Sequence, residues 1–474
     1  MRPVSLSASI VYLVGLIAAT SGLSIAAATP VQNSPPTEAR DDAVIVVRIL
    51  SSTSPFWLNI SGRESTISIA ANNNLSLPAD AGTRLQVRSR SGYMELSGSG
   101  ADHLDDKTAL TSVSITADGD GVLEIQTESL RRAYRGRIQI SVDEKEGVLI
   151  IYNQVEVEEY VASVVASEYG LKDEEGAKAM AVVARTYAMR AQQNEKTRTS
   201  FLDDTRSQVY RGFDSTTTRS RRAANGTAGQ TIEFNGQLIE AVYSSSNGGL
   251  TAANESIWAG APIPYLRPRI DPYDAISPHS NWDAVLNKDR LHSALSDRYN
   301  MTVTSLQFGG QEKDGRIRTV TLKQDRGDER QISGSSFRAI AGGLNSQLKS
   351  TFFKVKERGR DYQFEGQGFG HGVGMSQWGA HGMALQGSEY DDILNFYYPG
   401  TSLRYPTDIP ALAGDMGLAR GASGAVPSEI NTSGTEGFSS AASPPTITQT
   451  QIKGWAGRQS VTTRTENKRR RIGW

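Results

Sequence analysis

One glutamate stands where a helix would otherwise present only apolar side chains. Val157, Val161, Val164 and Glu168 are separated by four, three and four positions, so a helix places them on one face. The valines direct this face toward a core, and partial removal from water there raises the pKa of a carboxyl group. A carboxyl that keeps its proton near neutral pH can act as a general acid. The same spacing also fits a glutamate that is exposed or ion-paired at a helix end.

A single carboxyl group is enough for one class of glycoside cleavage. Hydrolysis normally needs two carboxyl groups that flank the scissile bond. In a lytic transglycosylase, one residue protonates the glycosidic oxygen and then accepts the proton of the sugar's own C6 hydroxyl, which attacks intramolecularly. A lone Glu168 is therefore compatible with non-hydrolytic cleavage of a glycan.

Glycine occupies every second position from residue 366 to residue 374. In an extended chain this spacing leaves one face without side chains, which a flat sugar ring could approach. The alternative, which we favour, is a tight turn in which glycine serves only the backbone geometry. The stretch matches neither GxGxxG nor a P-loop. Residues 374–378 approach a GxSxG elbow, but Trp378 stands in place of the last glycine, which argues against a serine hydrolase.

The composition excludes several classes of site. The 474 residues include no cysteine, which rules out thiolate metal sites and catalytic cysteines. The five histidines contain no HExxH pair, and we expect neither a metal nor another cofactor. The net charge of -1 provides no overall field that would attract nucleic acid.

Strand-like and helix-like segments come in runs along the chain and do not alternate. Short strands are predicted between residues 43 and 130, followed by a hairpin within residues 134–152. Helices are predicted at residues 157–169, 174–193 and 391–398. This order predicts a β-rich α+β fold with a few helices.

Both ends of the chain differ in composition from its middle. Arg2, an apolar stretch at residues 10–19 and small residues near Ala28 are typical of a secretory signal, with an uncleaved membrane anchor as the alternative. Either segment, at residues 1–28, would place the rest outside the cytoplasm, in the cell envelope or secreted. Residues 29–42 are predicted to form a linker, and residues 406–474 a disordered low-complexity tail.

Eight segments, in this order, carry a resemblance to a known family: residues 157–169, 176–188, 207–212, 243–251, 264–274, 333–338, 370–377 and 393–401. Together they resemble the stage II sporulation protein D family, which includes the amidase enhancers. The resemblance covers about residues 131–405 and implies that these form the catalytic domain, preceded by a small β-rich module at residues 43–130.

The resemblance implies a lytic transglycosylase that cleaves the MurNAc–GlcNAc bond of peptidoglycan strands and leaves 1,6-anhydro ends, in some members on strands stripped of stem peptides. It makes Glu168 the general acid and base. The implied glycan-binding residues are Arg185, Tyr187, Gln208, Tyr210, Ser245, Ser246, Gly248, Gly249, Gly370, His371, Gly372 and Gln377. Helix packing remains an alternative role for Arg185 and Tyr187, a structural turn for Gln208 and Tyr210, and a structural role for His371.

Two other functions remain open on the sequence. The chain could bind glycan and stimulate a partner amidase without cutting, or it could be an inactive scaffold at the cell wall. Some family members hold a metal with Cys and His near the Ser-Gly-Gly strand, where this chain has Ser245 and Ser246, so we expect no structural zinc. Asn395 and Phe396 also depart from the family pattern, which often has a histidine before its paired tyrosines. The expected partners are peptidoglycan strands and a cell-wall amidase, with a membrane only if the N-terminal segment stays uncleaved.

Overall fold

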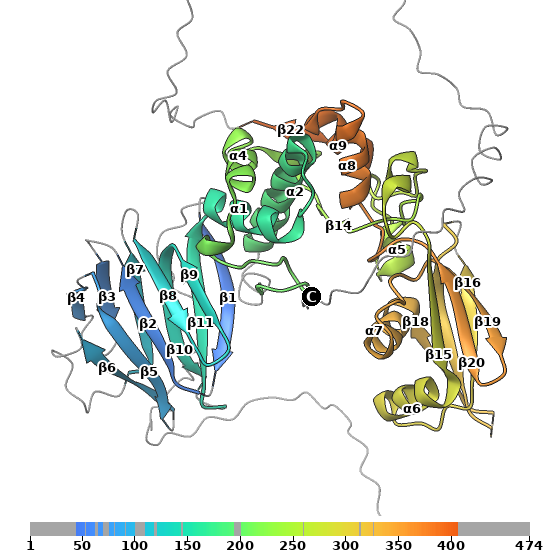
Figure 1. Cartoon of the computed structure of the whole chain (residues 1–474), viewed down its shortest axis with the longest axis horizontal. Helices are drawn as coiled ribbons and strands as arrows, with labels where there is room; N and C mark the ends of the chain where they lie inside the picture. Colours follow the sequence, from blue (N-terminus) through green and yellow to red (C-terminus); the bar gives the residue numbers. More distant parts are fainter. Residues whose placement is uncertain are drawn as a thin grey trace, which may run out of the picture. The chain divides into compact units, whose positions relative to one another are not determined.

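The computed structural model describes residues 44–405, apart from residues 53, 62–64, 70–74, 80, 91, 100–109, 118–120, 144–145, 194–200, 259, 312–313 and 326 (Figure 1). The predicted signal or anchor, linker and C-terminal tail lie outside the described residues. Within them, no helix combines the length and the hydropathy that crossing a bilayer would require. The described elements are mixed helices and mainly antiparallel sheets, so the predicted β-rich α+β class is confirmed.

Two antiparallel sheets form the first part of the chain, coloured blue to cyan in Figure 1. The first has the order β1 (Val44–Ser52), β11 (Val148–Glu156), β10 (Gly136–Asp143), β7 (Ser112–Ala117), β3 (Ser65–Ile69) and β4 (Leu75–Ala79). The second has the order β6 (Tyr93–Ser99), β5 (Arg84–Arg90), β2 (Phe56–Ser61), β8 (Val122–Gln126) and β9 (Arg131–Tyr134).

Alternating burial gives each sheet one apolar face. Ile138, Ile140 and Val142 are buried on β10, and Leu123 and Ile125 are buried on β8. Both sets belong to one hydrophobic core, as expected for half-buried antiparallel strands.

The sheets cross the domain boundary that the sequence predicts at residue 130. Strand β9 pairs with β8, and β10 pairs with β7. The predicted hairpin is confirmed as β10 and β11, but its strands complete the sheet begun by β1 and β7. The reason is that strands distant in sequence must pair to bury their apolar faces, which local composition does not reveal.

Helices follow β11 directly and pack against the same core. The predicted pair of helices is confirmed as α1 (Val157–Glu168) and α2 (Glu174–Gln192), and the last predicted helix as α9 (Tyr390–Tyr397). Contacts join α1 and α2 to α4 (Thr218–Gly226), and α2 to α8 (Gln377–Leu385) and α9.

Short strands bring distant segments together beside these helices. One small antiparallel sheet has the order β13 (Gln237–Leu238), β12 (Thr231–Phe234) and β22 (Ser402–Arg404). In addition, β14 (Tyr243–Ser244) pairs in parallel with β21 (Met375–Ser376). This last pairing places the segment after residue 243 against the glycine-dense stretch.

Residues 282–366 form a part with its own hydrophobic core. Its elements are β15 (Trp282–Asn287), α6 (Lys288–Tyr299), β16 (Ser305–Gln311), β17 (Ile317–Lys323), β18 (Glu329–Ser333), α7 (Gly334–Leu344), β19 (Phe353–Arg358) and β20 (Asp361–Gly366). Two three-stranded sheets, β15-β20-β19 and β16-β17-β18, enclose an aromatic cluster around Phe308 and Phe337.

Candidate functional site

Glu168 is the last residue of α1 and is partly buried. The backbone N–H of Val209 donates to its Oε1 at 2.8 Å, and the hydroxyl of Tyr243 donates to the same carboxyl group. Removal from water raises the pKa of Glu168, and the two hydrogen bonds and the charge of Arg211 offset this only in part. Glu168 forms no ion pair with any described residue. Among these residues, the alternative of an ion-paired Glu168 is therefore wrong.

A second layer of buried polar groups holds Tyr243 in place. The hydroxyl of Tyr160 donates to Gln208 Oε1 at 2.9 Å, and Gln208 Nε2 donates to the hydroxyl of Tyr243 at 3.4 Å. Because Gln208 is completely buried, it touches Tyr243 and not a glycan. Its hydrogen bonds favour the structural alternative for Gln208, which is to position the residue that bonds Glu168.

The segment 207–212 lies along α1. Burial alternates in it, with Gln208 and Tyr210 buried and Val209 and Arg211 partly exposed. The N–H of Arg211 donates to Ser163 Oγ at 3.1 Å, which adds a second backbone tie to α1. Gly212 closes the segment at a φ of 82°, where a Cβ would overlap the carbonyl oxygen of Ala133.

Two further predicted glycan contacts, Arg185 and Tyr210, have structural positions. Arg185 is 0% exposed, and its guanidinium donates to Glu158 at 2.9 and 2.5 Å and to the Gln230 carbonyl at 3.1 Å. Tyr210 is buried and donates to Asn153 Oδ1 at 2.7 Å. Packing already uses the polar groups of Arg185 and Tyr210, which favours the structural roles stated for them as alternatives.

Tyr187 keeps a partly exposed ring. It lies on α2 and packs against Phe201 with ring centroids 6.2 Å apart. Burial raises the pKa of its hydroxyl. The contacts of Tyr187 therefore agree with the alternative role of helix packing.

Two buried aspartates organise the segment after β14. Asp274 accepts from Ser246 Oγ at 2.7 Å, Gly248 N–H at 2.8 Å and Ser376 Oγ at 2.5 Å. Burial raises the pKa of Asp274 despite these bonds. Ser246 and Gly248 thus both bond to Asp274 in this structure, and their contact with a glycan stays a prediction.

Asp271 fixes the neighbouring turn in the same manner. Its Oδ2 accepts from Asn247 Nδ2 and from the Tyr397 hydroxyl, each at 2.6 Å. Asn247 Oδ1 in turn accepts from the N–H of Gly249 at 2.8 Å. The N–H of Gly249 thus belongs to the hydrogen bonds of the turn. The side chain of Ser245, earlier in the same segment, is partly exposed.

The glycine-dense stretch is a folded loop and not an extended strand. Gly368, Gly370, Gly372 and Gly374 all have φ values between 71° and 107°. A Cβ on Gly374 would overlap the Val242 carbonyl oxygen, and each of the other three would also press on a neighbour. The idea of a bare face for a sugar is therefore wrong, and close backbone packing accounts for the glycines.

His371 lies in this loop next to an exposed tryptophan. Burial, with the charges of Arg316 and Arg338, lowers the pKa of His371 to about 3, so its ring is neutral at physiological pH. The N–H of Val373 donates to its Nδ1 at 3.0 Å. The ring of Trp258, which is 42% exposed, lies 4.9 Å from the His371 ring. His371 is partly exposed, whereas Gln377, the first residue of α8, is buried.

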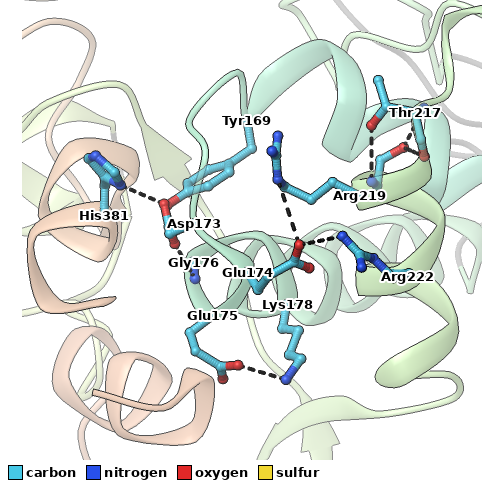
Figure 2. A network of polar contacts seen from close by, with 11 residues as sticks. Tyr169, Asp173, Glu174, Glu175, Gly176, Lys178, Thr217, Arg219, Arg222 and His381 are labelled. Atoms are coloured by element: carbon cyan, nitrogen blue, oxygen red, sulfur yellow. Dashed lines mark hydrogen bonds and ion pairs between the residues drawn. The ribbon is translucent and has the colours of Figure 1, made fainter. Parts of the chain in front are cut away.

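A carboxylate network secures the chain just after Glu168 (Figure 2). Asp173 caps α2 by accepting from the N–H of Gly176 at 2.6 Å. It also accepts from the Tyr169 hydroxyl at 2.9 Å and contacts His381 Nδ1 at 2.5 Å (Figure 2). One side chain thus ties the end of α1, the start of α2 and α8 together.

The geometry brings together residues that the sequence did not single out for a role in the site. Tyr243 bonds Glu168, Arg211 acts on its charge, and Trp258 exposes an aromatic face beside His371. Tyr243 belongs to a segment of the resemblance and Trp258 to none of those given above, and nothing local distinguishes either residue from core aromatics. Within the described part of the chain, no cluster of three or more acidic or histidine side chains is arranged to hold a metal.

A separate shallow pocket of about 450 Å³ opens in the part with the second core. Trp282, Asp283 and Phe352 are among its lining residues. None of the residues named above as contacts of Glu168 lines it, so it does not belong to the candidate site.

Comparison with known proteins finds a family model that matches part of this chain and relatives that match about half of it. A family model described as "Stage II sporulation protein" matches residues 145–234, which contain α1, α2 and the segment 207–212. The amidase enhancer of Bacillus subtilis (strain 168) is 31% identical over 278 residues, or 48% of this chain and 38% of that protein.

Two further relatives are matched over most of their length. Stage II sporulation protein D of Bacillus subtilis (strain 168) is 30% identical over 266 residues, which cover 52% of this chain and 74% of that protein. The protein of the same name from Bacillus amyloliquefaciens is 31% identical over 270 residues, again with 52% and 74% covered.

Proposed function

This chain belongs to the stage II sporulation protein D family, and on that premise we propose that it is a peptidoglycan lytic transglycosylase. The reaction is cleavage of the MurNAc–GlcNAc bond with formation of a 1,6-anhydro end, on strands that an amidase has stripped of stem peptides. We place it outside the cytoplasm, where the expected signal or anchor would deliver the chain.

One observation carries the proposal: a partly buried carboxyl with a raised pKa, held from two sides at the end of α1. Val209 and Tyr243 fix the orientation of Glu168, and burial keeps more of it protonated near neutral pH. Among the described groups whose charges act on the pKa of Glu168 there is no second carboxylate. This favours the one-carboxyl reaction over hydrolysis, which needs two.

In the proposed reaction, Glu168 first donates its proton to the glycosidic oxygen as the bond to C1 breaks. The C6 hydroxyl oxygen of the same MurNAc then bonds to C1, and its proton passes to Glu168, which restores the acid. The Val209 N–H and the Tyr243 hydroxyl stabilise the carboxylate that exists between these steps. Tyr243 is a positioning residue, and Gln208 supports it.

The exposed face of Trp258 next to His371 extends the proposed binding surface. A hydrogen-bonding link joins the two regions, because the His371 ring bonds to the backbone of Tyr243, whose hydroxyl reaches Glu168. A tryptophan face and a neutral imidazole suit the C–H face and hydroxyls of a sugar.

A second candidate is a glycan-binding enhancer of a cell-wall amidase that cuts nothing itself. One relative is named amidase enhancer, which favours this candidate. The match covers 38% of that relative's length. The two functions differ in whether Glu168 is needed, since stimulation of a partner requires docking and not proton transfer.

The deciding experiment incubates the full chain with peptidoglycan, intact and stripped of stem peptides, and identifies the products by mass spectrometry. We expect anhydro-ended glycans from the wild-type chain and a loss of at least about 100-fold in Glu168→Gln. Glu389→Gln, an exposed glutamate before α9, is the matched control. Products without anhydro ends would indicate hydrolysis, and stimulation of an amidase by Glu168→Gln without any cleavage would favour the enhancer.

A further inference from the structure

Arg211 is a cation beside Glu168 whose side chain has no partner among the described residues. Its charge acts on Glu168, and its backbone N–H is fixed to Ser163 on the same helix. No hydrogen bond or ion pair joins its guanidinium to the part of the chain that the structure describes, and the side chain is only partly buried. Its five N–H donors thus have no described partner, in a residue only two positions after the Val209 N–H that bonds Glu168.

The acidic groups around Arg211 are already committed elsewhere. Its charge also acts on Asp203 and Asp204. Arg132 pairs with Asp203 at 2.8 Å, and Arg206 pairs with Asp204 at 2.6 Å. Both aspartates on which Arg211 acts are thus paired with another arginine, and Arg211 is not. The site is therefore suited to receive one anion of the substrate.

The substrate class contains one such anion. Each MurNAc carries a lactyl ether whose carbonyl is an amide while the stem peptide is attached. Removal of the peptide by amide hydrolysis converts it into a carboxylate, and GlcNAc carries no equivalent group. An arginine binds a carboxylate through two parallel hydrogen bonds but gains much less from a neutral amide.

From this arrangement we propose that Arg211 binds the lactyl carboxylate of the MurNAc at the cleavage site and so selects strands stripped of stem peptides. The inference rests on the proposed function and adds the residue that determines specificity. It gives Arg211 a role that differs from proton transfer, which belongs to Glu168.

The test measures binding and not cleavage, so that it is independent of turnover. Full-length Glu168→Gln protein is titrated with glycan strands stripped of stem peptides, with the same strands after methylamidation of their carboxyl groups, and with the neutral GlcNAc hexamer. We expect the free carboxylate strands to bind about tenfold tighter than the methylamidated ones. Adding Arg211→Gln should abolish this difference and leave binding of the GlcNAc hexamer unchanged.

Two further variants separate this role from a general effect of charge or folding. Arg211→Lys should retain a smaller preference, because lysine keeps the charge without the paired donors. Arg222→Gln, an exposed arginine that pairs with Glu174 on α2 (Figure 2), removes the same charge and should keep the full preference.

The inference is overturned if Arg211→Gln still prefers the carboxylate strands, or if the parent protein shows no preference. Equal loss of binding to all three glycans in Arg211→Gln would instead assign the residue a structural role and also overturn it. If the parent protein binds no glycan at all, the proposed function fails, and this inference fails with it.

Discussion

Glu168 has a carboxyl group that folding holds in a partly dehydrated position. Its raised pKa means that the folded chain binds this proton more tightly than the unfolded chain does. The resulting stability is fully present below the unfolded pKa, about 4.3, and is lost as pH rises through the folded pKa. An ionisable carboxyl at this position therefore weakens the fold at neutral pH.

Replacing Glu168 with glutamine should stabilise the protein at neutral pH. Glutamine still accepts from Val209 but cannot ionise, so we expect a gain of about 1 kcal/mol at pH 7.5 that disappears at pH 4. Thermal or denaturant unfolding across this pH range measures it. For Glu389→Gln, the change in unfolding free energy should not increase with pH. If the change for Glu168→Gln is the same at all pH values, the argument is contradicted.

At the scale of elements, the site depends on a loop that packs backbone against backbone. The pairing of β14 with β21 holds residues 368–374 against the segment that follows Tyr243. Asp274 joins the two segments by accepting from Ser246 on one and Ser376 on the other. The loop thereby fixes His371 and supports Tyr243, both far in sequence from Glu168.

Gly374→Ala should destabilise the protein far more than Gly387→Ala. Both glycines have left-handed φ values, 71° and 91°, so each alanine costs about 1 kcal/mol in backbone strain. At Gly374 the Cβ would overlap the Val242 carbonyl, whereas at Gly387 no atom of the described residues lies within 4 Å of it. We expect a total loss of at least about 3 kcal/mol for Gly374→Ala in denaturant unfolding. Equal losses would show that the loop can open at little cost.

At the scale of the whole molecule, the described residues hold two hydrophobic cores. The first joins the N-terminal sheets to the helices that carry Glu168. The second lies within residues 282–366, with hydrogen bonds such as Trp282 Nε1 to the Gly368 carbonyl, 2.9 Å, connecting it to the glycine loop. Separate cores predict that each part can open locally without the other.

Hydrogen exchange should reveal this independence. Phe337 is completely buried among Phe308, Phe353 and Phe364, so Phe337→Ala should remove about 3–5 kcal/mol from the second core. Exchange should accelerate in residues 282–366 and remain slow in β10 and β11. Ile140→Ala in the first core should give the reverse pattern, and acceleration of both parts by either variant would show one cooperative unit.

The sequence by itself determined the local elements and the position of Glu168. A helical repeat of valines is a local property, so both α1 and the place of Glu168 at its end followed from spacing. The signature segments likewise fixed the family. The contacts of a single side chain do not follow from spacing. The Val209 N–H that bonds Glu168, for example, comes from 41 positions away in the sequence.

Only the tertiary structure showed which side chains of the signature segments are buried and which stay accessible. Arg185, Gln208 and Tyr210 belong to such segments, yet they are buried and their polar groups bond to other residues of the chain. The physical reason is that burial of a polar side chain requires partners, and these are supplied by elements that are distant in sequence. Arg211, next to Tyr210, is partly exposed instead, and its guanidinium has no hydrogen-bond or ion-pair partner among the described residues.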